Sequence, residues 1–348
     1  MRVPYARSTA FPTSLVGSDP QPDWLIDKAK LKGRFPPRTR ALELWRIDGA
    51  HLDEAFGDAV RLAVSDQIAA GLDIITDGEA CRESYSNHFA TALDGVDIDH
   101  PGEALDRSGE PVPVPRITGP ISRRGPISTG EVEALRKLTE KPIKFTVPGP
   151  FTMAQQAQND FYPSTKDAAL DYADAVREEV KDLFAAGADI VQLDEPYMQA
   201  RPEAAEDYGI EALNRALSGI AGTTCVHICF GYAALIHERP EGYSFLPQLH
   251  QACCGQISIE TAQSNLDCSV LTSLPEQTIL LGVIDLSTPE VESVDTIVSR
   301  VKRALPFIDK ERVVLAPDCG MKYLPRDISF QKLCNMTAVA KALREEFG

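Results

Sequence analysis

The stretch Cys225-Val226-His227-Ile228-Cys229 carries side chains that bind metal ions in many proteins. In an extended strand, residues two apart point to the same face, so the imidazole of His227 and the thiol of Cys229 would project together. This pair supplies half of a tetrahedral metal site. A buried strand with a satisfied core histidine and a small apolar cysteine explains the same residues, and both interpretations stay open at this point.

Two later apolar runs each end in a further potential ligand, Glu260 and Cys319. If both runs are strands parallel to the first, their carboxyl ends can meet His227 and Cys229 around one ion. One nitrogen, two sulfurs and one carboxylate oxygen suit a borderline-soft ion such as Zn²⁺, whereas magnesium or calcium would want oxygens throughout. The sequence therefore predicts a zinc site of His227, Cys229, Glu260 and Cys319.

These motifs resemble the catalytic domain of cobalamin-independent methionine synthase and its short single-domain relatives. The resemblance rests on His-x-Cys at 227–229, Ile-Glu-Thr at 259–261 and Pro-Asp-Cys-Gly at 317–320. Four earlier motifs follow the same family order: Leu15-Val16-Gly17-Ser18, Asp77-Gly78-Glu79, Pro148-Gly149-Pro150-Phe151-Thr152 and Leu193-Asp194-Glu195-Pro196. The resemblance implies a (β/α)8 TIM-type barrel of the uroporphyrinogen decarboxylase and methionine synthase superfamily.

The order of expected helices and strands favours the same α/β barrel. An apolar helical stripe from Leu52 ends at Gly71 and is followed by a strand at 72–76, and a capping box at Ser164 begins a second such unit. Nine strands are expected: 14–17, 72–76, 116–118, 143–147, 189–193, 224–228, 256–259, 279–285 and 313–316. A barrel needs one fewer, and the short 116–118 segment is the expected extra strand. A doubly wound sheet would alternate similarly, but no glycine-rich phosphate loop follows the first strand.

The length of 348 residues fits one barrel domain over 1–348, because no linker divides the chain. Residues 1–50 are expected to form an N-terminal extension that includes the first strand. Two segments are expected to be excursions over the barrel mouth: 97–115, which is acidic and lacks apolar periodicity, and 232–255, which contains a proline-rich stretch.

The composition excludes several classes of protein. Hydrophobic residues make up 43% and charged residues 25%, which is typical of a soluble globular protein. A net charge of −16 disfavours nucleic acid and anionic membranes as partners. The N-terminus has no apolar leader and no apolar run is long enough to span a bilayer, so we expect a cytoplasmic enzyme. Eight cysteines are too sparse for a disulfide scaffold in a chain of this length.

The predicted ligand set also indicates a reaction. Three negatively charged ligands around a dication leave a centre that binds a substrate sulfur better than it polarises a carbonyl. A metal-bound thiol loses its proton, so it is a thiolate near neutral pH and can attack an electrophilic carbon. The resemblance implies an S-methyltransferase that makes methionine from homocysteine, with the thiol entering the coordination sphere and loosening Glu260.

The resemblance further implies how the two charged ends of homocysteine are bound. Glu79 and Asp194 would hold the ammonium group, because cations bind best to converging carboxylates in a partly dry site. The backbone at three positions would bind the carboxylate: Val16, Gly17 and Ser18. A different role is expected for Glu195, since strand-end acids commonly cap helices.

The methyl-donor side departs from full-length family members. Where the family has a tryptophan that stacks on folate, a glutamate that binds the pterin and a catalytic histidine, this chain has Gln156, Ala200 and Ser287. Arg116 matches an arginine on the folate side of the family's site. The loss of a stacking ring costs about 1–3 kcal/mol if nucleobase stacking is a guide. We therefore expect a donor other than polyglutamyl methylfolate, such as a methylcorrinoid or a separate methyl-donating protein.

Two further functions are compatible with the sequence. In the first, the fold and metal are kept but a different thiol opens an epoxide or demethylates another substrate. Glu79 and Asp194 argue against a thiol that lacks an amine. In the second, the chain is a metal-free decarboxylase-like or non-catalytic barrel, although a charge of −16 does not suit the anionic porphyrin that such relatives bind.

Overall fold

The computed structural model describes residues 10–32, 36–105, 110–231 and 242–347. The expected excursion at 232–255 therefore lies partly outside the described residues, and so do four residues of the excursion at 97–115. None of the described helices is both long enough and apolar enough to cross a membrane.

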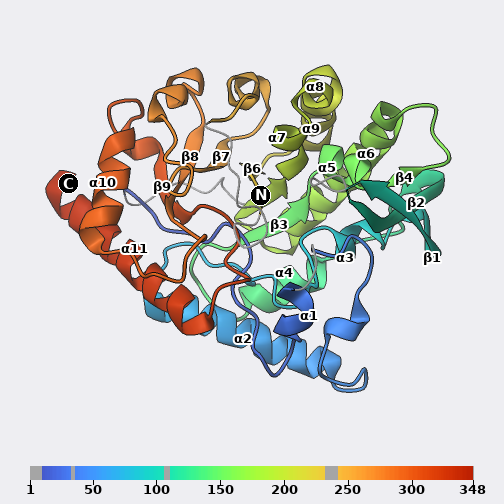
Figure 1. Cartoon of the computed structure of the whole chain (residues 1–348), viewed down its shortest axis with the longest axis horizontal. Helices are drawn as coiled ribbons and strands as arrows, with labels where there is room; N and C mark the ends of the chain where they lie inside the picture. The colour runs from blue at the N-terminus through green and yellow to red at the C-terminus, as the bar shows by residue number, and fades with distance from the viewer. Residues whose placement is uncertain (1–9, 33–35, 106–109, 232–241, 348) are drawn as a thin grey trace.

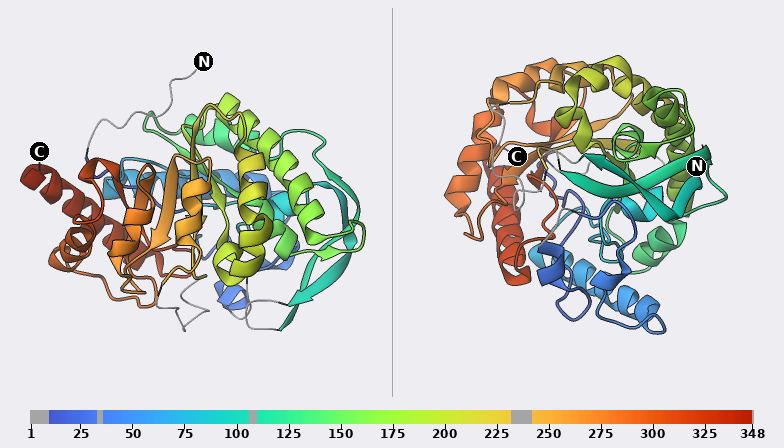
Figure 2. Two further views of the ribbon diagram at one scale, coloured as in Figure 1. Left: turned by 90° about the horizontal axis from the view of Figure 1, so that it is seen from above. Right: turned by 45° about the vertical axis from the view of Figure 1, so that its right-hand side comes forward.

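A parallel barrel forms the centre of the molecule (Figures 1 and 2). Six of its strands are hydrogen-bonded in chain order: β3 (Lys144–Pro148), β5 (Ile190–Asp194), β6 (Thr223–Ile228), β7 (Gln256–Glu260), β8 (Thr278–Ile284) and β9 (Val313–Pro317). Two short segments join the edges of this sheet through three parallel bridges: Thr13 to Leu315, Ser14 to Ile74, and Ile75 to Ile143. The predicted (β/α)8 barrel is thereby confirmed, and each of its strands had been expected from a buried apolar run.

Helices surround the strands, as Figure 2 shows. The α-helices of the described chain are α1 (Lys28–Lys32), α2 (Leu52–Ala70), α3 (Asn87–Ala90), α4 (Thr129–Arg136), α5 (Pro150–Gln155), α6 (Thr165–Ala186), α7 (Pro196–Ala200), α8 (Pro202–Ala204), α9 (Ile210–Leu217), α10 (Val294–Ala304) and α11 (Arg326–Phe347). Shorter helical turns lie at Leu42–Leu44, Ala205–Gly209, Leu246–Gln251, Cys268–Ser273 and Lys310–Arg312.

The ends of α2 and α6 follow the predicted capping signals. Gly71 has φ +90°, a left-handed conformation that ends α2 without steric cost because glycine lacks Cβ. The hydroxyl of Ser164 accepts a hydrogen bond of 3.1 Å from the Asp167 N–H at the start of α6. Gly71 therefore fixes where α2 ends, and Ser164 fixes where α6 begins.

A second, three-stranded sheet lies outside the barrel at the right of Figure 1. β1 (Asp94–Leu105) and β2 (Pro111–Ser122) are antiparallel, and β4 (Gln158–Asn159) pairs with β2. The 116–118 segment is thus the extra strand that the sequence predicted. The long strands on either side of residues 106–109 were not expected, because β1 buries a single residue and therefore shows no apolar alternation.

The inside of the barrel has a hydrophobic layer of its own. It is a cluster of buried residues separate from the main core: Val16, Ile74, Ile190, Cys225, Leu280, Val314 and Ala316. Cys225 is fully buried there, as expected of a cysteine that serves packing. Side chains two and four residues further along a strand point the same way, so His227 on β6 and Asp194 on β5 lie above the layer, towards the carboxyl ends of the strands.

Candidate active site

Three of the four predicted metal ligands come together at the carboxyl ends of two strands. His227 lies near the end of β6, Cys229 directly follows this strand, and Cys319 follows β9. Their ligand atoms all lie within 4.8 Å of one another, and all three residues are buried. A ring nitrogen and two thiols at this spacing suit a soft or borderline metal ion, so the donor set fits zinc.

The surroundings of the cluster orient its imidazole. His227 Nδ1 lies 3.0 Å from the Ser258 hydroxyl, whereas Nε2 is buried without a hydrogen-bond partner among the described residues. Burial alone would lower the pKa of His227, but the Cys229 sulfur and the Asp194 carboxylate outweigh it and raise this pKa. A hydrogen bond with Cys229, together with burial, raises the pKa of Cys319 well above its ordinary value. The Cys319 thiol therefore keeps its proton unless a cation stabilises the thiolate form.

The fourth predicted ligand, Glu260, lies beside the cluster but outside the group of three. It ends β7, and its Oε1 accepts a hydrogen bond of 2.9 Å from the Phe230 N–H. Its backbone N–H donates to the Tyr243 hydroxyl at 2.8 Å. Glu260 is close enough for its charge to raise the pKa of Cys319.

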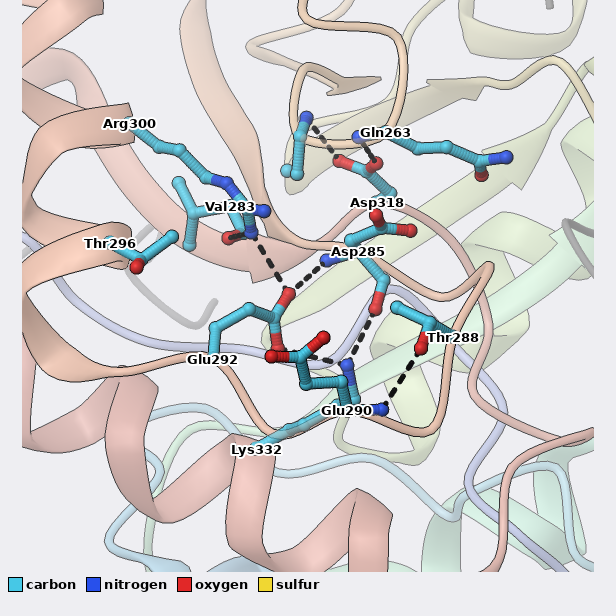
Figure 3. Close-up of polar contacts among 12 residues, drawn as sticks. Gln263, Val283, Asp285, Thr288, Glu290, Glu292, Thr296, Arg300, Asp318 and Lys332 are labelled. Carbon is cyan, nitrogen blue, oxygen red and sulfur yellow. Dashed lines mark hydrogen bonds and ion pairs between the residues drawn. The ribbon is translucent and has the colours of Figure 1, made fainter.

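Asp318 ties the ends of β7 and β9 together. Its Oδ1 accepts hydrogen bonds of 3.0 Å from the N–H groups of Thr261 and Ala262, and its Oδ2 accepts one of 2.7 Å from Gln263 (Figure 3). A Cβ at Gly282 would lie 2.3 Å from Asp318 Oδ1, so only glycine leaves room there. Because Asp318 precedes Cys319 and grips the residues after Glu260, it fixes one relative to the other.

Glu79 offers a buried carboxylate oxygen towards the same end of the barrel. Its Oε1 accepts a hydrogen bond of 3.0 Å from the Thr146 hydroxyl, while Oε2 is buried with no hydrogen-bond partner in the described part of the chain. Glu79 has φ +51°, which is strained for a residue other than glycine. A Cβ at Gly17 would lie 2.3 Å from Oε1, so the carboxylate packs directly on the Gly17 backbone.

Asp194 lies between Glu79 and the metal-ligand cluster. It ends β5 in register with His227 on β6, and its Oδ1 accepts a hydrogen bond of 2.8 Å from Gln192. Burial and the charge of Glu79 raise the pKa of Asp194 to about 7, although His227 opposes this shift. Two acids whose charges influence each other are therefore buried next to a thiol and imidazole cluster.

The first barrel segment supplies polar groups next to Glu79. The Thr76 hydroxyl donates to the Gly17 carbonyl at 3.1 Å, and the Met321 N–H donates to the Ser18 carbonyl at 2.9 Å. The hydroxyl of Ser18 is buried and has no hydrogen-bond partner among the described residues. The Met321 contact links residues 16–18 to the loop that follows Cys319.

Sequence reasoning missed the basic side chains around Glu79. Arg82 is buried; its Nη2 lies 3.0 Å from Asp77 and 3.2 Å from Glu131, and its Nη1 donates to Thr146. Lys144 and Lys322 are buried as well. A signal was available for Lys144, since it is a charged residue within the otherwise apolar run at 143–147.

Two other residues singled out in the sequence lie apart from this site. Arg116 is on β2, outside the barrel, where it is partly exposed and forms an ion pair of 2.6 Å with Asp160. Glu195 caps a helix as expected, but the helix is α5 rather than the one that follows it. Its carboxylate accepts hydrogen bonds of 3.0 Å and 2.8 Å from the N–H groups of Phe151 and Thr152.

The positions that differ from the family's folate site carry polar or small side chains. Gln156 is buried; it donates to the Tyr85 hydroxyl at 2.7 Å and accepts from Ser86 at 3.3 Å. Ala200 ends α7. Ser287 is exposed, and its N–H and hydroxyl donate to Asp285 at 2.8 Å and 2.7 Å.

An ion-pair network holds the loop that carries Asp285 and Ser287 (Figure 3). Glu292 accepts hydrogen bonds of 2.7 Å from the Asp285 N–H and 2.9 Å from Arg300. The fully buried Lys332 donates to Glu292 at 2.9 Å and to the Asp285 carbonyl at 2.8 Å. These contacts fix the loop that follows β8, and the Ser287 side chain remains exposed at the surface.

A parallel barrel with thiol, imidazole and carboxylate groups at its strand ends defines the architecture of a barrel enzyme, and comparison with known proteins identifies its family. The family model of the cobalamin-independent synthase catalytic domain matches residues 11–342. Methionine synthase of Sulfolobus acidocaldarius is 31% identical over 340 residues, 97% of this chain and 94% of that protein. That of Saccharolobus solfataricus is 31% identical over 344 residues, 97% of this chain and 96% of that protein.

Solved structures agree with this match. A B12-independent methionine synthase from a Shewanella species, in complex with selenomethionine, superposes with a TM-score of 0.88 at 32% identity, covering 97% of this chain and 99% of that one. A methyltransferase from Methanosarcina mazei shares the fold, with a TM-score of 0.64 at 15% identity, covering 97% and 95%. The chain belongs to the family of cobalamin-independent synthase catalytic domains. It is an enzyme of the methyltransferase class.

Proposed function

We propose that this enzyme forms methionine by zinc-dependent transfer of a methyl group to the sulfur of homocysteine. One observation carries the proposal: His227, Cys229 and Cys319 place three ligand atoms within 4.8 Å of one another beside the buried acid Asp194. A metal site and an ammonium site at this proximity match a substrate that carries both a thiol and an amine.

His227, Cys229 and Cys319 would hold the ion, and Glu260 would supply the fourth ligand. Bound zinc would lower the pKa of a coordinated substrate thiol, so that the sulfur is a thiolate near neutral pH. The buried Nε2 of His227, which lacks a hydrogen-bond partner in the described chain, supports a role as metal ligand. Ser258 would fix the ring through Nδ1.

The amino-acid part of homocysteine would bind between Ser18 and Glu79. Both residues have a buried oxygen without a hydrogen-bond partner in the described chain, one a hydroxyl donor and the other a carboxylate acceptor. Ser18 and the backbone of Val16 and Gly17 would receive the substrate carboxylate. Glu79 and Asp194 would receive the ammonium group, and in a buried site such charge-assisted hydrogen bonds are strong.

The methyl donor would differ from polyglutamyl methylfolate. The side chain of Gln156 is held by Tyr85 and Ser86, so a polar amide occupies the position at which the family stacks a ring on folate. Ser287 replaces the family's catalytic histidine and is exposed. A methylcorrinoid, free or carried by another protein, meets the remaining chemical requirement, and Arg116 would contact the donor from β2.

Metal analysis of the purified protein, with homocysteine titration of its cobalt-substituted form, tests the thiol half of the proposal. We expect one zinc per chain and a thiolate-to-metal absorption band that grows with homocysteine. Zinc without such a band would redirect the search to other thiols and to epoxide opening. The absence of bound metal in protein purified without chelators would overturn the proposal.

A single-turnover assay tests the donor half. Zinc-loaded enzyme and homocysteine are mixed with methylcobalamin or with mono- or triglutamyl methyltetrahydrofolate. The amount of methionine formed per enzyme is then measured. We expect methionine from the corrinoid in excess of that from either folate. Faster turnover with the triglutamyl folate would contradict the proposed donor and leave the thiol half intact.

A further inference from the structure

Two buried lysines from separate parts of the chain are anchored by backbone carbonyl groups close enough to Glu79 for its charge to act on both. Lys144 is fully buried, and its Nζ donates to the Leu15 carbonyl. Lys322 is 3% exposed, and its Nζ donates to the carbonyls of Arg82 at 2.7 Å and Glu83 at 2.9 Å. Among the ion pairs of the described residues, neither lysine has a carboxylate partner.

The barrel register places Lys144 beneath Glu79. The bridges Ser14 to Ile74 and Ile75 to Ile143 put Lys144 one step beyond a paired position, level with Thr76. Thr146, two residues further along β3, points to the same side and donates its hydroxyl to Glu79. Lys144 therefore approaches from inside the barrel, whereas Lys322 approaches from the loop that follows Cys319.

Burial of the two charged ammonium groups is unfavourable, because it removes them from water. Burial lowers the pKa of Lys144 and of Lys322 to about 8, and the charge of Glu79 opposes the shift in both. Glu83 also opposes it for Lys322, and Cys225 and Asp194 for Lys144. A methionine side chain would avoid this cost but would leave the backbone carbonyls without their donors. The lysines anchor the backbone, and their positive charge gives them a further role that a neutral side chain cannot perform.

The charges around Glu79 show what that role is. Burial raises the pKa of Glu79, and Asp77 and Asp194 act in the same direction; Arg82 and Lys322 oppose the shift. The Arg82 guanidinium is already shared between Asp77 and Glu131. Among the described residues, Lys144 and Lys322 are cations near Glu79 that form no ion pair with an acid. A protonated Glu79 would be a poor acceptor for an ammonium group.

We propose that Lys144 and Lys322 are positioning residues that act through Glu79: held by backbone carbonyl groups close to it, they keep its carboxylate ionised to receive the ammonium group of the amino-acid substrate. Lys144 also fixes the Leu15 carbonyl at the base of residues 16–18, which would bind the carboxylate end. The inference rests on the proposed function, because it takes an amino acid as the ligand.

Binding of L-methionine to the zinc-loaded enzyme tests the inference, because the product has the amino-acid group but no thiol proton to complicate the titration. Calorimetry compares wild type, Lys144→Met, Lys322→Met and the control Lys166→Met, whose exposed side chain pairs with Glu211 on the outside. We expect each buried variant to bind about tenfold more weakly than wild type near pH 6.5. The difference in affinity should narrow near pH 8.5, where Glu79 ionises in the variants and the lysines of the wild type lose their charge. The control should bind as wild type does.

A ligand without the amine separates a charge effect from general damage. The thioether acid 4-(methylthio)butanoate should bind the wild type and Lys322→Met alike, because Lys322 makes no contact with residues 15–18. Equal methionine affinity in wild type and both variants, or an equal loss of both ligands in Lys322→Met at every pH, would overturn the inference. If Lys144→Met fails to fold because the Leu15 carbonyl loses its partner, Lys322→Met decides, since it relies on different carbonyls.

Infrared spectroscopy gives a direct readout of the ionisation state. Near neutral pH, Lys322→Met should show an additional band of a protonated carboxylic acid relative to wild type, whereas Lys322→Met/Glu79→Gln should show none relative to Glu79→Gln. Asp19 and Asp194, whose pKa values are about 7, contribute to both members of each pair. An additional band in the second comparison would assign the proton to another acid and refute the role of Lys322. Failure of wild type to bind methionine at all would instead count against the proposed function.

Discussion

The metal-ligand cluster and the carboxylate cluster lie at the ends of neighbouring strands, yet they are built on different principles. His227, Cys229 and Cys319 need only the right atoms at the right spacing, which two strands supply. Glu79 and Asp194 depend on their charge state: burial raises the pKa of both, and cationic groups from separate parts of the chain oppose this shift. Geometry therefore governs the first cluster and electrostatics the second. Substitutions should damage them in different ways.

The largest effect is expected from the cysteines of the metal cluster. Cys229→Ser or Cys319→Ser replaces a soft sulfur ligand with a hydroxyl, so we expect zinc affinity and methionine formation to fall by at least about 100-fold. Metal analysis after dialysis and the single-turnover assay measure both quantities. Methionine binding by the apoprotein through its amino-acid group should persist.

Cys254→Ala is the matched control, because Cys254 is also a buried thiol but lies outside the cluster. It should keep one zinc per chain and full activity. If either Cys229→Ser or Cys319→Ser did the same, the two cysteines would be packing residues, and the contrast between the two clusters would disappear.

The next largest effect is expected on the carboxylate side alone. In Gly17→Ala the new Cβ would lie 2.3 Å from Glu79 Oε1, so the carboxylate must move. We expect zinc content to stay at wild-type level while methionine affinity falls about 10- to 100-fold, the worth of a charge-assisted hydrogen bond of about 1.5–3 kcal/mol. Calorimetry and metal analysis on the same sample separate the two clusters.

Gly130→Ala controls for the loss of a glycine. Gly130 lies in α4, and a Cβ added there would have no atom within 4 Å, so alanine should leave both zinc and methionine binding unchanged. If Gly17→Ala lost zinc and methionine together, the two clusters would form one mechanical unit instead of two separable ones.

Asp19 carries a pH effect on the carboxylate side, since it follows Ser18 and accepts a hydrogen bond of 2.9 Å from Ser329. Burial raises its pKa in the folded protein to about 7, from an ordinary value of 3.8. Below the pKa of unfolded Asp19, its carboxyl group is protonated in both the folded and the unfolded protein, so the stability that the raised pKa contributes is fully present. It is lost as the pH rises towards the folded pKa, because the unfolded state ionises first.

Asp19→Asn should therefore gain stability relative to wild type as the pH rises from about 4 to about 7, by an amount on the order of 4 kcal/mol if the whole pKa shift is realised. Urea unfolding of both proteins at matched zinc loading measures the difference. Asp66, Arg326 and Lys28 also act on Asp19, and they are present in both proteins, so their titration largely cancels. A constant difference across this range would show that Asp19 is ionised in the folded state.

The contrast between the clusters also explains how far the sequence could predict the site. That His227, Cys229 and Cys319 come together was predictable, because strand alternation and strand ends place these three candidate ligands from local pattern alone. The hydrogen bonds of Lys144 and Lys322 were not predictable, because their partners are backbone carbonyl groups, which every residue type has. Glu195 illustrates the limit, since its capping role was expected but its partner helix is set by strand order.

The parts of the fold also differ in how well the sequence predicts them, for the same reason. Barrel strands such as β5 are buried along their whole length and read as apolar runs, and Gly71 and Ser164 mark helix ends through local chemistry. The β1–β2 sheet has mostly exposed or half-buried positions, so pairing between backbone groups determines it. Sequence pattern reports burial and local capping, and structure decided by backbone pairing or distant contacts escapes it.

The smallest effect is expected at Arg116, which lies on β2 and belongs to neither cluster. Its ion pair with Asp160 is partly exposed, so Arg116→Ala should lower the free energy of unfolding by less than about 1 kcal/mol. Zinc content and methionine affinity should not change. If Arg116 serves the methyl donor, as proposed, the KM for the donor should rise while methionine affinity stays constant.

Asp160→Ala is the matched variant, because it removes the same ion pair but leaves the guanidinium in place. A rise in KM in Arg116→Ala alone would assign the guanidinium to the donor, whereas equal behaviour of both variants would reduce Arg116 to a structural residue of the β1–β2 sheet.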